Sequence, residues 1–299
     1  MSKDDLDQRL QQLNLKTRFP VEHLLAGEYR SVFKGRGMDF DEIRGYVPGD
    51  DVQTIDWNVT ARTGTPHIKR YIEERELAVW FLVDTSASCR LAPGGTTNKQ
   101  KWDVMHEITT LLALSAVQNH DRCGLILFSD RVEHIVPLRR GRPHVYHLLS
   151  DMLDVKAEGQ KTDLQPALAA LNHLSPRRGL VFLLSDFLCE ANREVLGMTS
   201  FRQDLVAIAV NDPWEKEPPN CGLVEVADAE SGETRLWDFR AKQAKICREA
   251  FSRNRSDLKT ELEAVGADLM ELDTQQDCAE TLASFFRQRL RRIADESGG

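Results

Sequence analysis

The chain has 299 residues, of which 41% are hydrophobic and 29% are charged, and its formal net charge is −8. This balance predicts a globular protein and excludes a largely disordered one. The mild acidity disfavours a general binder of nucleic acid or of anionic membranes. The longest apolar run, residues 77–83, is far shorter than the roughly 18 residues of a membrane-spanning helix.

The cysteines and the N-terminal residues indicate where the protein works. The six cysteines are scattered and include no CxxC pair, which favours free thiols over a disulfide framework or a zinc site. The chain starts without the apolar core of a signal peptide. We therefore expect a cytoplasmic protein.

Residues 1–75 are expected to form an N-terminal part with its own character. Leu6, Leu10 and Leu13 recur at the spacing of one helix face, which predicts a short helix. Residues 35–76 are rich in Gly, Asp and Arg, and the alternation at residues 55–57 and 68–72 indicates short strands. We expect this β-rich segment to dock beside the sheet that follows.

From residue 76 onward, buried strands alternate with helices. Such alternation predicts βαβ units and a doubly wound, mainly parallel α/β sheet over residues 76–299. The expected strands are 77–83, 123–128, 179–184, 204–210 and 267–272, with 132–138 as a hairpin partner of the second strand and a further hairpin at 223–226 and 234–237. The expected helices are 102–117, 145–153, 164–174, 240–265 and 277–293.

Oxygen-bearing side chains follow two of these buried strands and end one intervening loop. Ligands of open α/β sheets bind beyond the carboxyl ends of the strands, so these side chains are candidates for one site. The candidates are Asp84, Ser86 and Ser88 in a D-x-S-x-S, Thr162 before a helix, and Asp186 after a later strand.

Two carboxylates and three hydroxyls provide hard oxygen ligands, which suit Mg²⁺ or Mn²⁺. The five side chains leave an open coordination position for water or for an incoming acid group. Two alternatives stay open. A serine after a strand is often a helix cap, and a water-filled site could serve packing alone.

The five residues resemble the metal-ion-dependent adhesion site of von Willebrand factor A domains. In that family a D-x-S-x-S follows the first strand, a Thr comes from a later loop, and an Asp follows the fourth strand. The resemblance implies that Asp84, Ser86, Ser88, Thr162 and Asp186 bind the metal directly or through water. It also implies that a carboxylate of a partner protein completes the shell.

The N-terminal motifs are similar to those of a bacterial family called domain of unknown function fifty-eight. They read G-R-G-M-D-F from Gly35, R-G-Y-V-P-G-D-D from Arg44, and I-D-W followed by A-R from Ile55. Met38-Asp39-Phe40 stands where the family usually has an aliphatic residue followed by Glu and Phe. Cys89 stands where relatives often carry Met, a difference that we expect to leave the site unaffected. The resemblance implies a partner, a MoxR-type AAA+ ATPase, and a role in assembling or activating client proteins.

Two functions follow from these patterns. The first is a metal-ion-dependent protein-interaction module that captures a partner carboxylate and has no catalytic residue. The alternative is a Mg²⁺- or Mn²⁺-dependent hydrolase of phosphatase type, in which the ion polarises a phosphoryl oxygen. The sequence offers no D-x-D motif, no second metal set and no assigned general base for this alternative. We therefore expect binding rather than turnover.

Overall fold

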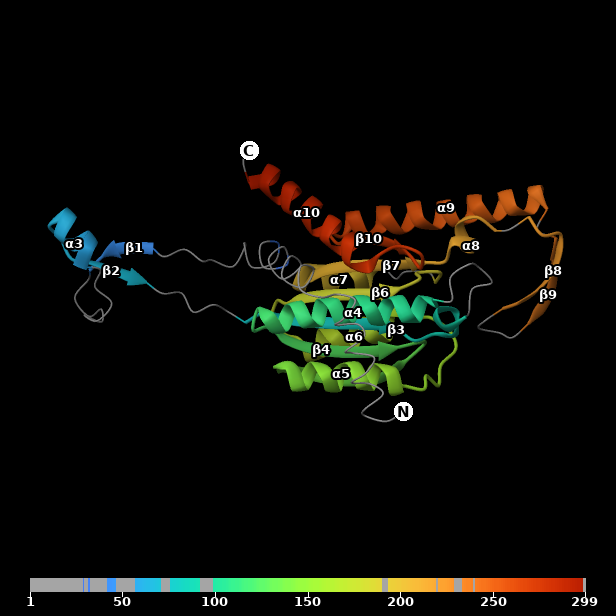
Figure 1. Cartoon of the computed structure of the whole chain (residues 1–299), viewed down its shortest axis with the longest axis horizontal. Helices are drawn as coiled ribbons and strands as arrows, with labels where there is room; N and C mark the ends of the chain where they lie inside the picture. The colour runs from blue at the N-terminus through green and yellow to red at the C-terminus, as the bar shows by residue number, and fades with distance from the viewer. Residues whose placement is uncertain are drawn as a thin grey trace.

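The computed structural model describes residues 29, 32, 42–46, 57–70, 76–91, 99–189, 193–218, 220–228, 233–238 and 240–297. A six-stranded sheet with the order β10-β7-β6-β3-β4-β5 forms the centre (Figure 1). Its strands are β3 (Ala78–Asp84), β4 (Arg122–Phe128), β5 (Val132–Arg140), β6 (Leu180–Ser185), β7 (Asp204–Asn211) and β10 (Asp268–Asp273). All neighbours pair in parallel except β4 and β5, which form an antiparallel hairpin.

Helices cover both faces of this sheet. One face packs against α4 (Lys101–Gln118), α5 (Arg142–Asp154) and α10 (Cys278–Ser297). The other packs against α6 (Leu164–Leu174), α7 (Arg193–Arg202) and α9 (Ala241–Ala264). The two faces are built from alternate residues of each strand, so Val79, Phe81 and Val83 face one core while Trp80 and Leu82 face the other. The predicted doubly wound, mainly parallel fold is confirmed.

The two strands in the middle of the sheet are apolar up to their last residue because both of their faces are buried. Every residue of β3 and of β6 is buried, which explains why these segments read as continuous hydrophobic runs. Gly124 lies opposite Trp80, and a Cβ at this position would lie 2.7 Å from the indole ring. Only glycine therefore lets β4 pass this large side chain without a shift.

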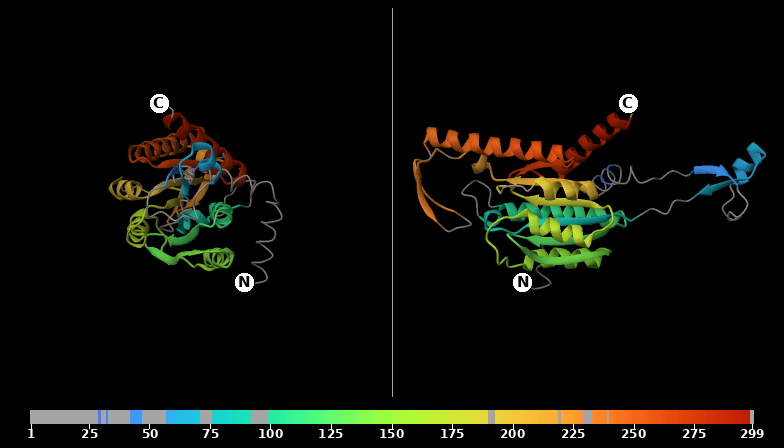
Figure 2. Two further views of the ribbon diagram at one scale, coloured as in Figure 1. Left: turned by 90° about the vertical axis from the view of Figure 1, so that its left-hand side faces the viewer. Right: turned by 180° about the vertical axis from the view of Figure 1, so that it is seen from behind.

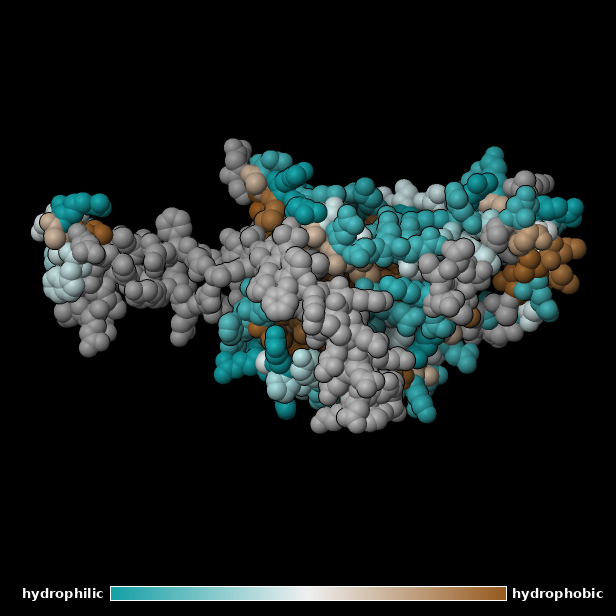
Figure 3. All heavy atoms as spheres, in the orientation of Figure 1, coloured by the Kyte–Doolittle hydropathy of each residue, from teal (hydrophilic) through white to brown (hydrophobic). Residues whose placement is uncertain are grey.

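A short helix and a second hairpin, which forms a separate two-stranded sheet, follow the carboxyl end of β7. Helix α8 (Pro213–Lys216) follows β7 and leads to the antiparallel hairpin of β8 (Leu223–Ala227) and β9 (Thr234–Asp238). The hairpin extends away from the main body (Figure 1). Exposed apolar side chains gather on it (Figure 3), including Leu223, Leu236 and Trp237.

The described part of the N-terminal segment differs from the expectation. Strands β1 (Glu42–Gly45) and β2 (His67–Arg70) pair around α3 (Trp57–Thr63). This unit lies apart from the main sheet instead of docking beside it (Figure 2). The alternation at residues 55–57 was too short to be informative, since Trp57 begins a helix. The predicted helix around Leu6, Leu10 and Leu13 lies outside the described residues.

Two further expectations can be checked against the described residues. None of their helices is long and apolar enough to cross a membrane. Within the same residues, the six cysteines form no disulfide. The division of the chain at residue 75 stays a prediction.

Candidate metal centre

Asp84 ends β3 at the carboxyl edge of the sheet, where its side chain is fully buried. Its Oδ1 accepts a hydrogen bond from the Ser86 backbone N–H at 2.8 Å, and its Oδ2 accepts one from the Ser185 hydroxyl at 2.6 Å. Ser185 is the last residue of β6, the strand next to β3. The loop after β3 and the end of β6 therefore each hold one oxygen of the carboxylate.

Ser86 and Ser88 follow on the loop after β3. Ser86 is buried, and its hydroxyl lies 3.1 Å from that of Ser88. Ser86 precedes the one-turn helix η2 (Ala87–Arg90), but its side chain makes no capping hydrogen bond to that helix. The helix-cap interpretation of these serines is thus wrong for Ser86, whose hydroxyl is directed to Ser88.

Asp186 follows β6 and is fully buried next to a lysine. The ammonium group of Lys101, from the start of α4, donates hydrogen bonds to Asp186 Oδ2 at 2.7 Å and to Glu215 Oε1 at 2.6 Å. Lys101 is only 5% exposed. A buried charge needs a partner, and Lys101 has two.

The two aspartates have opposite pKa shifts. Burial and the negative charge of Asp186 raise the pKa of Asp84 to about 6, although its hydrogen bonds with Ser185 and Ser86 oppose this. Burial would also raise the pKa of Asp186, but the charge and hydrogen bond of Lys101, together with Ser88, lower it below its ordinary value. Asp186 is therefore the better ionised of the pair, and Asp84 lacks a cation of its own.

The backbone around Asp186 is held in a strained turn. Phe187 is 2% exposed and has a φ of 51°, a region that bulky residues rarely enter and that costs on the order of 1–3 kcal/mol. Arg255 of α9 donates a 2.5 Å hydrogen bond to the Asp186 carbonyl, and Phe187 N–H donates to the Ser185 hydroxyl. These contacts fix the direction of the Asp186 side chain.

Thr162 lies on the loop before α6, which approaches the same edge of the sheet. The Asp163 N–H donates to the Ser129 carbonyl just after β4, and the Ala87 N–H donates to the Gln160 carbonyl. A Cβ at Gly159 would lie 2.1 Å from the Ser129 hydroxyl, so glycine allows the close approach. The Thr162 hydroxyl is buried and has no hydrogen-bond partner among the described residues.

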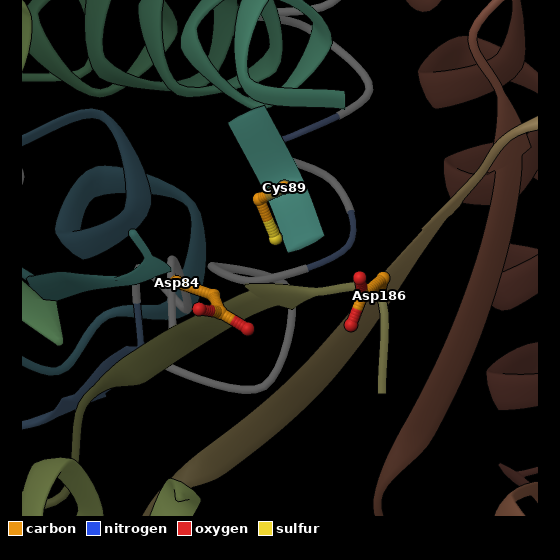
Figure 4. Close-up of side chains that lie close together, drawn as sticks. All are labelled: Asp84, Cys89 and Asp186. Carbon is orange, nitrogen blue, oxygen red and sulfur yellow. The ribbon is translucent and has the colours of Figure 1, made fainter. Parts of the chain in front are cut away.

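Cys89 is a part of this centre that the sequence interpretation set aside. Its thiol and one carboxylate oxygen each of Asp84 and Asp186 all lie within 4.8 Å of one another (Figure 4). Cys89 is fully buried, and the Ser86 hydroxyl donates to its sulfur at 3.7 Å. The expectation that Cys89 leaves the site unaffected was wrong, because η2 turns its side chain back toward both carboxylates.

These residues fit a divalent cation in charge and in donor type. Asp84, Asp186 and Glu215 carry three negative charges when ionised, whereas Lys101 and the buried Arg255 guanidinium at the Asp186 carbonyl supply two positive charges. A bound cation would add the positive charge that is still lacking, and buried charges are stable only when they are compensated. The unpartnered Thr162 hydroxyl offers a further oxygen donor.

The structure therefore brings Asp84, Ser86, Ser88 and Asp186 into one cluster through direct contacts, and it places Thr162 on a neighbouring loop of the same edge. That all five bind a metal stays a prediction. Sequence reasoning missed Ser185, Cys89, Lys101 and Glu215. The position of Ser185 beside Asp186 was the available signal, whereas Lys101 and Glu215 are 114 residues apart and carry no shared motif.

Solved structures with similar overall shape have low sequence identity. BatB from Bacteroides thetaiotaomicron is 10% identical, with a TM-score of 0.45 over 72% of this chain and 99% of that chain. The proximal thread matrix protein 1 of mussel byssus, with a zinc-occupied MIDAS motif, is 16% identical, with a TM-score of 0.40 over 72% of this chain and 47% of that chain.

Relatives found by sequence have higher sequence identity to this chain than these solved structures have. An uncharacterized protein of Mycobacterium tuberculosis is 32% identical over 285 residues, covering 94% of this chain and 89% of the relative. An uncharacterized protein of Mycobacterium avium is 32% identical over 159 residues, covering 52% of this chain and 94% of the relative. A family model described as protein of unknown function DUF58 matches residues 42–261. Because this match spans well over half of its residues, the chain belongs to the DUF58 family.

Proposed function

We propose that the protein is a metal-ion-dependent interaction module that binds a carboxylate of a partner protein in the cytoplasm. The partner implied by the family resemblance is a MoxR-type AAA+ ATPase, and the role is assembly or activation of client proteins. Mg²⁺ or Mn²⁺ would be held by Asp84, Ser86, Ser88, Thr162 and Asp186. In this proposal the protein acts by binding and has no catalytic residue.

The observation that carries the proposal is the pair of buried carboxylates with incomplete compensation. Asp84 and Asp186 are both fully buried, yet the Lys101 ammonium hydrogen-bonds to Asp186 and not to Asp84. A bound divalent ion would stabilise both carboxylates. Hard divalent ions take six or more oxygen ligands, so this small donor set leaves room for a carboxylate from outside.

An exposed apolar surface at the same end of the molecule supports a protein partner. Helix α8 carries Glu215, which contacts Lys101, and the chain then enters the β8–β9 hairpin. Leu223 is 67% exposed and Leu236 is 73% exposed on this hairpin. Exposed apolar patches of this kind mark interaction sites in many proteins. A partner seated on the hairpin would reach the carboxyl edge of the sheet.

The test is capture of the cognate ATPase by the full chain, with Mg²⁺ present and after removal of metal by EDTA. The proposal predicts capture with Mg²⁺, loss with EDTA, and recovery when Mg²⁺ is added back. Asp186→Asn should lose capture, whereas Asp163→Asn, an exposed helix cap on the neighbouring loop, should retain it. Capture that is indifferent to EDTA and to Asp186→Asn would contradict a metal-bridged contact.

A further inference from the structure

A sulfur atom among the carboxylates changes which metals the centre would prefer. Cys89 Sγ lies within 4.8 Å of a carboxylate oxygen of Asp84 and of Asp186 (Figure 4). Hard ions such as Mg²⁺ bind oxygen and gain little from sulfur, whereas Zn²⁺ binds Cys, His and carboxylate ligands together. A sulfur atom therefore lies beside the oxygen atoms that the sequence indicated.

We propose that Cys89 is a direct ligand of the bound metal and that its sulfur makes the site select Zn²⁺ over Mg²⁺. This inference rests on the metal site of the proposed function and identifies its ion. Asp84, Cys89 and Asp186 would bind Zn²⁺ directly, and the hydroxyls of Ser86, Ser88 and Thr162 would surround this smaller set of ligands. The fourth position of a tetrahedral zinc would take the partner's carboxylate.

The geometry needs only a small closure. Zinc lies about 2.3 Å from sulfur and about 2.1 Å from oxygen, so two ligands of one tetrahedral ion are about 3.6 Å apart. The three atoms are already within 4.8 Å of one another. Cys89 lies on η2, directly after the D-x-S-x-S loop, and Asp84 and Asp186 follow neighbouring strands. A shift of about 1 Å among three side chains would complete the arrangement.

The surroundings of the thiol distinguish it from an ordinary buried cysteine. A buried cysteine usually behaves as a small hydrophobic residue. Cys89 does pack against the apolar core, but its sulfur also meets the hydroxyls of Ser86 at 3.7 Å and Ser88 at 3.9 Å. The thiol is therefore at the boundary between the core and the polar cluster, with the carboxylates on its polar side.

The experiment compares the full-length protein with Cys89→Ser after all metal has been removed under reducing conditions. Cys123→Ser is the matched control, because Cys123 is also fully buried but lies near the start of β4, at the other end of the sheet. Co²⁺ serves as a spectroscopic probe, since a sulfur ligand adds a near-ultraviolet charge-transfer absorption. Zn²⁺ and Mg²⁺ affinities are measured by competition and calorimetry. Thermal melts verify that each variant is folded.

We expect the charge-transfer absorption in the unchanged protein and in Cys123→Ser, and its loss in Cys89→Ser. Zn²⁺ affinity should fall at least about tenfold in Cys89→Ser, with Mg²⁺ affinity unchanged within about threefold. Co²⁺ binding without that absorption, together with equal Zn²⁺ affinity in Cys89→Ser, would overturn the inference and leave the proposed function standing. Absence of metal binding, or Zn²⁺ binding unaffected by Asp84→Asn, would overturn both.

Discussion

Lys101 donates a 2.7 Å hydrogen bond to Asp186, although the two residues are 85 positions apart in the chain. Lys101 begins α4 on one face of the sheet, and Asp186 follows β6 in the middle of it. The ammonium group is a built-in cation at the candidate metal centre, with Glu215 as its second anion. It stabilises one of the two buried carboxylates and would share that carboxylate with a bound metal.

Replacing Lys101 by Met should therefore destabilise the metal-free protein. Loss of one partner of a buried ion pair leaves an uncompensated charge and costs about 3–5 kcal/mol. Added Mn²⁺ should restore stability more in Lys101→Met than in the unchanged protein, because the ion no longer shares Asp186 with an ammonium group. Chemical denaturation with and without Mn²⁺ measures both effects.

Lys99→Met is the matched control for this substitution. Lys99 precedes α4 and forms an ion pair with Glu107 at the surface, where such pairs contribute about 0–1 kcal/mol. The stability of Lys99→Met, and the increase in stability that Mn²⁺ gives it, should match those of the unchanged protein. If Mn²⁺ stabilises Lys101→Met no more than it stabilises the unchanged protein, the ammonium group and the metal do not share Asp186.

The raised pKa of Asp84 predicts how stability depends on pH when metal is absent. In the folded state the pKa of Asp84 is about 6, whereas in the unfolded state the carboxyl group has its ordinary pKa of 3.8. Between these values the folded state holds more protons, so the free energy of unfolding falls as pH rises through this window. The loss is on the order of 3 kcal/mol and is nearly complete at about pH 7.

Asp84→Asn should remove this dependence, because an amide keeps the shape of the carboxyl group and does not titrate. Denaturation curves from pH 4 to 7.5 should show the unchanged protein losing stability relative to Asp84→Asn as pH rises. Parallel pH profiles of the two proteins would contradict an Asp84 that is protonated in the fold.

The fold and the cluster of oxygen-bearing side chains at the end of β3 could be predicted from the sequence because both depend on local patterns. Residues 77–83 form a continuous apolar run, as a strand buried on both faces should, and D-x-S-x-S begins where β3 ends. Helix α7 was missed, since its residues 193–202 show little amphipathic spacing and include Gly197 and Thr199. Its helix forms against α6 and β7, which a pattern in one segment cannot show.

The cation and the sulfur of the centre could not be predicted. Lys101 looks like an ordinary exposed lysine at the start of a helix, and only the folded chain brings it to Asp186 and Glu215. Cys89 follows the motif by a single residue, so its identity was visible but its direction was not. The turn of η2 decides whether that side chain enters the core or the site.

Thr162→Val should weaken metal binding with little effect on stability. The Thr162 hydroxyl is buried and makes no hydrogen bond within the described residues, so removing it breaks no contact and changes the free energy of unfolding by less than about 1 kcal/mol. Thr162→Ser keeps the hydroxyl and should bind Mn²⁺ normally. Mn²⁺ titration should give an affinity about tenfold lower for Thr162→Val and an unchanged affinity for Thr162→Ser. Equal affinities for all three proteins would remove Thr162 from the ligand set.

The apolar hairpin predicts a variant that separates partner binding from metal binding. Leu223→Ser combined with Leu236→Ser should reduce capture of the ATPase while leaving Mn²⁺ affinity and thermal stability unchanged, because both side chains are mostly exposed. Phe201→Ser is the control, since Phe201 is 89% exposed on α7. If the double variant captures as much ATPase as the Phe201→Ser control does, the hairpin is excluded from the contact.

The hydrolase alternative makes its own prediction. A screen of phosphate esters with Mg²⁺ and with Mn²⁺ should show no turnover that depends on Asp186, because the proposed role of the ion is to hold a partner's carboxylate. Turnover that disappears in Asp186→Asn and persists in Asp163→Asn would support the hydrolase instead.

A crystal of the full chain grown with Mn²⁺, with anomalous diffraction measured at a wavelength where manganese scatters, tests the central claim most directly. The account predicts one strong anomalous peak between the carboxylates of Asp84 and Asp186, next to the Thr162 hydroxyl. A fully ordered centre with no peak, in which Lys101 alone compensates the two carboxylates, would contradict it.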